Sequence, residues 1–167
     1  MGVLFIFILI FLYRNRNYFL FGIPSKALLA GSPSLLGRTV ATILYGAGKR
    51  IHKSFAAFDE SAEDYLKDPE NTFLYFGDLD YEGIKIFETL ASHCTFTKIT
   101  PFREAYIKML EKAESIQLSK TKEKQNRNIS GLFFSFFEQP LVDRMKRILE
   151  NDRYIPQEIL NVTDYRQ

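Results

Sequence analysis

Two aspartates spaced i, i+2, Asp78 and Asp80, are the residues of this sequence whose types and spacing best suit chemistry. They follow the apolar run 73–76 (FLYF), which is typical of a buried parallel strand. Residues i and i+2 of an extended segment point the same way, and the carboxyl ends of parallel strands form the edge where ligands bind. Two carboxylates there suit a hard cation such as Mg²⁺. The pattern predicts a metal site formed by Asp78 and Asp80.

A structural role for Asp80 is the alternative, because aspartate is common at helix N-caps. Apolar residues at helical spacing follow it in 84–91, and Glu88 is expected on the outer side of that helix. Glu82 would then favour the positive end of the helix dipole. An Asp-x-Asp pair is a short motif. Metal ligation and N-capping therefore both stay open from the residues alone.

The elements that must position this pair alternate between apolar runs and helical patterns. The expected strands are 3–13, 39–45, 73–76 and 96–99, and the expected helices are 51–66, one after Asp80, 103–117 and 140–149. Strands that alternate with helices are connected by right-handed parallel crossovers. The order therefore predicts an α/β fold.

Length and composition are those of one globular domain. The chain has 167 residues, of which 46% are hydrophobic and 25% are charged. A single cysteine, Cys94, excludes an intrachain disulfide and suits a reducing, cytoplasmic location. The apolar run 3–13 has 11 residues, about half of what a membrane-spanning helix needs. No membrane attachment is expected.

Charge is unevenly divided along the chain. Residues 1–58 carry seven Lys and Arg and no acid, whereas residues 59–167 carry 15 Lys and Arg against 20 Asp and Glu. A basic half beside an acidic metal site suits a protein that handles phosphodiesters. Lys49, Arg50 and Lys53 follow a glycine-containing turn where a helix would present free N–H groups to an anion. They are the candidate DNA-binding residues, with a solvated helix face as the alternative.

The segment GDLDYEG (77–83) after an apolar strand resembles the Asp-x-Asp motif of toprim domains, the Mg²⁺-binding fold of topoisomerases, primases and several nucleases. The order of a strand with a glycine turn at 46–48, a helix, YFGDLDYEG, ITPF and a long helix is similar to the C-terminal toprim domain of JetD, the DNA-cleaving subunit of the Wadjet plasmid-defence system. It resembles the topoisomerase VI A subunit more distantly. The resemblance covers residues 39–160 and implies a toprim-like (Rossmann-like), mostly parallel central sheet flanked by helices.

The resemblance implies a DNA endonuclease that depends on Mg²⁺ or Mn²⁺. Asp78 and Asp80 would hold the metal, and Glu82 would be a third catalytic residue. DNA and condensin-like Wadjet subunits are the implied partners, and a homodimer is a further option. Toprim domains also place a glutamate at the end of the first strand, near Phe7 or Ile8, where this sequence has no acid. Either that glutamate is lost or the chain begins late. The alternative function is a degenerate, non-catalytic toprim module that binds DNA or protein.

Three parts are expected along the chain. Residues 1–118 form the toprim-like core, whose first strand is truncated or degenerate; residues 119–128 form a polar linker; and residues 129–167 form a helical extension that packs on the core. The aromatic run 132–137 is expected to be core or interface. Glu158 could join the acidic site, but a position away from it is favoured.

Overall fold

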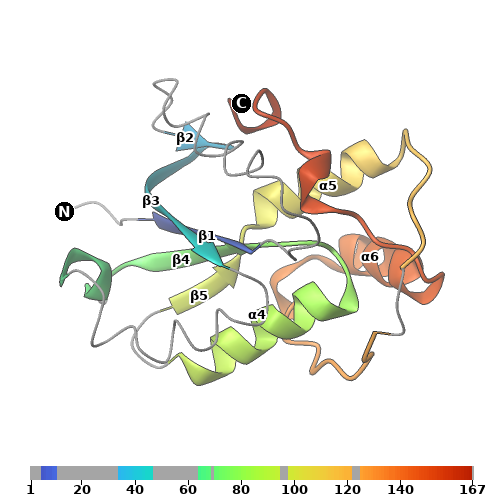
Figure 1. Ribbon diagram of the computed structural model, residues 1–167, viewed down its shortest axis with the longest axis horizontal. Coiled ribbons are helices and arrows are strands. Elements are labelled where there is room, and N and C mark those ends of the chain that lie inside the picture. The colour runs from blue at the N-terminus through green and yellow to red at the C-terminus, as the bar shows by residue number, and fades with distance from the viewer. Residues whose placement is uncertain are drawn as a thin grey trace, which may run out of the picture.

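Five strands form one sheet in the order β2-β3-β1-β4-β5 in the computed structural model (Figure 1). The structure describes residues 5–10, 34–46, 64–68, 70–94, 98–121 and 125–166. The strands are β1 (Phe5–Ile10), β2 (Ser34–Leu35), β3 (Arg38–Gly46), β4 (Thr72–Phe76) and β5 (Lys98–Pro101). β1 pairs in parallel with β3 and β4, β4 pairs in parallel with β5, and β2 is antiparallel to β3. The described sheet is therefore mostly parallel.

Helices follow the last two strands and lie on either side of the sheet. They are α4 (Tyr81–His93), α5 (Arg103–Ala113) and α6 (Gln139–Glu150), with the short 3-10 helices η3 (Asp64–Lys67), η4 (Phe134–Phe136), η5 (Gln157–Ile159) and η6 (Asp164–Arg166). Figure 1 shows α4 below the strands and α5 above them. The predicted α/β, toprim-like fold class is confirmed. Within the described ranges, no helix is both long and apolar enough to cross a bilayer.

Most of the predicted element boundaries lie within two residues of the observed ones. The strand expected to end at residue 99 continues to Pro101, which pairs with Tyr75. Proline is tolerated there because β5 is an edge strand and needs no N–H on its outer side. The helix expected over 51–66 falls almost entirely outside the described residues, and the structure has η3 at its end.

Aromatic side chains join the helices into one core. Phe133 is fully buried and lies edge-to-face against Phe87 of α4, with ring centroids 5.6 Å apart, and against Tyr106 of α5, at 5.0 Å. Phe137 approaches Tyr106 at 5.9 Å. Such aromatic pairs stabilise the fold by more than the burial of their surface area alone would. The aromatic run 132–137 is therefore a core segment, as one of the two expectations had it, although Leu132 at its start is 38% exposed.

Glu88 of α4 is buried, and its expected place on the outer side of the helix is wrong. Its carboxylate accepts backbone N–H groups from Ser130 at 2.6 Å, Gly131 at 2.8 Å and Phe133 at 3.3 Å. Gly131 has a positive φ of 87°, which glycine adopts without strain. The three hydrogen bonds to the charged carboxylate offset the free-energy cost of burying it. Glu88 thus fixes the start of the aromatic segment on α4.

Candidate metal centre

Asp78 follows β4 at the carboxyl edge of the sheet. The last residue of β4, Phe76, is paired with Leu9 of β1, so the carboxyl ends of the two strands lie side by side. The next N–H, of Gly77, donates to the hydroxyl of Tyr106 on α5 at 3.1 Å. The backbone is therefore bound to a buried tyrosine immediately after β4 ends. Both aspartates follow at the edge of the sheet where ligands bind in parallel α/β proteins.

Asp80 is the N-cap of α4. It has extended backbone angles (φ −144°, ψ 171°), and its Oδ1 accepts the N–H of Gly83 at 2.6 Å. Its Oδ2 accepts a hydrogen bond from Nε2 of Gln125, also at 2.6 Å. The residue is only 4% exposed. Burial raises the pKa of Asp80, whereas its hydrogen bonds from Gly83 and Gln125 act in the opposite direction.

Asp78 is partly buried, and its Oδ1 accepts the backbone N–H of Gln157 at 2.8 Å. Burial raises the pKa of Asp78 to about 7, the Gln157 hydrogen bond lowers it, and the negative charges of Glu158 and Asp80 raise it further. Glu158 itself is exposed. The two aspartates are thus close enough to interact electrostatically, and Glu158 adds to the negative field at Asp78.

Gly83 allows the first turn of α4 to approach this loop. A Cβ at this position would lie 2.3 Å from the backbone oxygen of Asp78 and 3.2 Å from Oδ1 of Asp80. The carbonyl of Gly83 also accepts a hydrogen bond from the buried hydroxyl of Tyr75 at 2.6 Å. The glycine of the GDLDYEG segment is therefore required by a close contact between the loop and the helix that the loop starts.

The C-terminal residues 154–165, here called the C-terminal strap, hold the loop from its other side. Leu79, between the two aspartates, forms an antiparallel bridge with Ile155: the N–H of Leu79 donates to Ile155 at 2.9 Å, and that of Ile155 donates back at 3.3 Å. Two residues later comes the Gln157 N–H that binds Asp78. The position of the acidic loop thus depends on a segment almost 80 residues farther along the chain.

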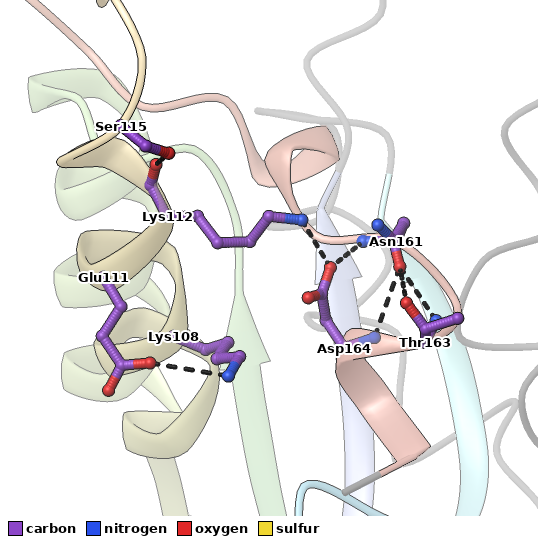
Figure 2. A network of polar contacts seen from close by, with 7 residues as sticks. All are labelled: Lys108, Glu111, Lys112, Ser115, Asn161, Thr163 and Asp164. Carbon is purple, nitrogen blue, oxygen red and sulfur yellow. Dashed lines mark hydrogen bonds and ion pairs between the residues drawn. The ribbon is translucent and has the colours of Figure 1, made fainter.

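The far end of the strap is fixed to α5 and to β2. Nζ of Lys112 lies 2.7 Å from Oδ2 of Asp164, which also accepts the N–H of Asn161 at 2.6 Å (Figure 2). The N–H of Leu36, after β2, donates to the carbonyl of the buried Tyr165 at 3.0 Å. The strap therefore connects the acidic loop, α5 and the β2 edge of the sheet.

Of the other candidate residues, the structure describes some and leaves others outside its described ranges. Glu82 lies in the first turn of α4, partly buried, where its charge raises the pKa of Asp80. The candidate DNA-binding residues Lys49, Arg50 and Lys53 lie outside the described residues. The family position for the first-strand glutamate, Phe7 or Ile8, lies within β1 and is paired in register with β4.

The donor set fits a divalent cation that keeps much of its hydration shell. Neither Asp78 nor Asp80 forms an ion pair with a lysine or arginine of the described residues, although both are withdrawn from solvent. The backbone N–H of Gln157 binds Asp78, whereas its buried side-chain amide has no hydrogen-bond partner among the described residues. Over the same ranges, no group of three or more His, Cys, Asp and Glu forms a closed cage. Mg²⁺ typically takes one or two carboxylates, with waters and substrate phosphates completing its shell.

The C-terminal contacts and Gln125 could not be identified from sequence patterns. Gln125 lies in the polar stretch 119–128, where no periodicity or motif marks it, and Gln157 acts on Asp78 through its backbone N–H, which any residue but proline could supply. Two local signals were present here: Pro156, which restricts the backbone just before Gln157, and Glu158, which was considered for the acidic site.

The chain matches a known protein family. Residues 35–162 match the family described as Wadjet protein JetD, C-terminal. The matched range contains Asp78, Asp80, Gln125 and most of the C-terminal strap, and it begins after β1. No curated protein matches the chain.

Proposed function

The chain belongs to the family of Wadjet JetD C-terminal domains, and we propose that it is a DNA endonuclease domain that depends on Mg²⁺ or Mn²⁺. In this proposal Asp78 and Asp80 bind the metal. DNA is the substrate, the condensin-like Wadjet subunits are partners, and Lys49, Arg50 and Lys53 contact DNA.

One observation carries the proposal: the carboxylates of Asp78 and Asp80 are withdrawn from solvent at the carboxyl edge of a parallel sheet. No lysine or arginine of the described residues forms an ion pair with either of them. Buried charges are normally paired or bound to metals. Burial and the negative charges of Glu158 and Asp80 raise the pKa of Asp78. A divalent cation would supply positive charge and would favour the ionised form of both side chains.

In the proposed mechanism, the acidic loop, the first turn of α4 and the C-terminal strap have different roles. Asp78 and Asp80 hold the cation, and Gly83 keeps the start of α4 against the loop. The cation, when bound, polarises the scissile phosphate and lowers the pKa of an attacking water. Glu82, in the first turn of α4, would be the third catalytic residue and would add negative charge beside Asp80. The C-terminal strap keeps Asp78 in place through Gln157 and Ile155.

The alternative, a non-catalytic toprim module that binds DNA or protein, is favoured by a different observation. β1 is Phe5–Ile10, it lies next to β4, and neither it nor any position before Asp59 contains an acid. A site with two carboxylates can retain metal and phosphate binding while lacking a group for general acid or base catalysis.

Plasmid cleavage distinguishes these functions. We expect the chain to nick or linearise plasmid DNA with Mn²⁺ or Mg²⁺ and to lose this activity on addition of EDTA. Asp78→Ala and Asp80→Ala should both abolish cleavage. Asp143→Ala, an exposed residue of α6, is the matched control and should cleave as the wild type does. Folded, metal-binding protein that leaves the plasmid intact would favour the non-catalytic module.

A further inference from the structure

The side chain of Gln125 makes two hydrogen bonds at the start of α4, where Asp80 and Tyr81 lie. Its Nε2 donates to Oδ2 of Asp80 at 2.6 Å, and its Oε1 accepts the N–H of Tyr81 at 3.0 Å. The first N–H groups of a helix have no partner within the helix. One amide group therefore satisfies a free donor of α4 and holds a carboxylate oxygen at the same time.

These contacts leave the Asp80 carboxylate with a fixed orientation. Its Oδ1 is held by the N–H of Gly83 and its Oδ2 by Gln125, so rotation about the bond to the carboxylate would break both hydrogen bonds. Each carboxylate oxygen has room for a second interaction. Both oxygens can therefore still bind a cation in the direction that the two donors leave open.

The backbone around Gln125 is itself anchored. The guanidinium of Arg127 lies 5.5 Å from the centre of the Tyr81 ring and forms an ion pair with Asp152 at 2.5 Å. Asp152 in turn accepts the backbone N–H of Thr121 through its carbonyl, at 2.9 Å. The described ends of the polar stretch are thus tied to α4 and to the segment that leads into the C-terminal strap.

We propose that Gln125 is a positioning residue of the metal centre, which sets the orientation of Asp80 for binding the cation. This inference rests on the proposed metal site and adds a residue to it from a distant part of the chain. The role requires a donor for Asp80 and an acceptor for Tyr81 on one planar group, which the amide of glutamine provides. An apolar side chain of similar size fills the space but supplies neither.

The affinity for Mn²⁺, measured by electron paramagnetic resonance on the full chain, tests the proposal without requiring cleavage. We expect Gln125→Met to weaken Mn²⁺ binding about 10- to 100-fold, the usual effect of losing a residue that orients a ligand. Gln117→Met, at an exposed position, is the matched control and should bind as the wild type does. Gln125→Asn keeps the amide on a shorter side chain and should lose less than Gln125→Met.

A second comparison separates positioning from a general loss of structure. In an Asp80→Asn background, Gln125→Met should cause no further loss of Mn²⁺ affinity, because Gln125 acts through Asp80. Wild-type affinity in both Gln125 variants would overturn the proposal while leaving the metal site intact, and so would an equal additional loss in the Asp80→Asn background. A wild-type chain that binds no Mn²⁺ would overturn the proposed function and this inference with it.

Discussion

Asp80 combines two roles that the sequence presents as alternatives. It caps α4 through the N–H of Gly83, which confirms the structural interpretation. The same hydrogen bond, together with the one from Gln125, fixes the orientation of the Asp80 carboxylate. The negative charge of Asp80 in turn raises the pKa of Asp78. Asp80 is buried and pairs with no lysine or arginine of the described residues, so its role as an N-cap is compatible with a role as a metal ligand. The cap also contributes to the order of the site.

Gly83→Ala tests the close contact between α4 and the loop. In an ordinary helix this change stabilises the protein by about 0.5 to 1 kcal/mol. Here the added Cβ would lie 2.3 Å from the backbone oxygen of Asp78, so we expect a loss of about 2 to 4 kcal/mol in the free energy of unfolding. Urea denaturation gives the value, with Ser92→Ala, at an exposed position in α4, as the control. A gain in stability would show that the helix start is not in contact with the loop.

Asp78 makes stability depend on pH in metal-free buffer. Its pKa is raised from 3.8 to about 7 in the folded chain, so between these values the folded chain holds a proton that the unfolded chain has released. The free energy of unfolding therefore falls as pH rises through this range. We expect any advantage of Asp78→Asn over the wild type to be greater at pH 8 than at pH 5, by about 2 to 3 kcal/mol.

Urea denaturation at both pH values, with EDTA present, measures this difference. Asp143→Asn is the control for the loss of an exposed carboxylate and should follow the wild-type pH dependence. Parallel pH dependences for Asp78→Asn and the wild type would contradict the burial of this side chain.

At the scale of elements, α4 is the part of the fold that joins the site to the core. Its first turn contacts the acidic loop through Gly83, and its middle holds the segment before η4 through Glu88. A disturbance of the aromatic segment can therefore reach the acidic loop through α4, against which Phe133 packs.

Glu88→Gln tests the connection between α4 and the aromatic segment. The glutamine amide has one acceptor oxygen, whereas the glutamate uses both of its oxygens to accept from Ser130 and Gly131. Its NH₂ group would face a backbone donor, so we expect the free energy of unfolding to fall by about 2 to 3 kcal/mol. Thermal or urea unfolding measures it, and Glu150→Gln, exposed at the end of α6, should change little. A neutral effect of Glu88→Gln would mean that these hydrogen bonds are not formed in solution.

For the whole molecule, local patterns in the sequence indicate the strands, the α/β class and the aspartate pair. An apolar run followed by Asp-x-Asp and a helical pattern lies within 20 residues, so the relevant contacts are local. Gln125 is 45 residues from Asp80, and Gln157 is 79 residues from Asp78. Their roles depend on how the chain returns to the sheet edge, which periodicity does not specify. Glu88 was misplaced for the same reason, because its partners come from a segment that covers the helix in the folded chain.

The central claim is that the sheet edge of this JetD-family domain binds a divalent cation through Asp78 and Asp80. Isothermal titration of the full chain with Mn²⁺ at pH 8 tests it most directly, with Asp78→Asn, Asp80→Asn and the control Asp143→Asn measured beside the wild type. We predict binding by the wild type and the control, and a loss of more than about tenfold in affinity in each of the other two variants. Absence of binding by the folded wild type, or equal affinity in all four proteins, would contradict the account.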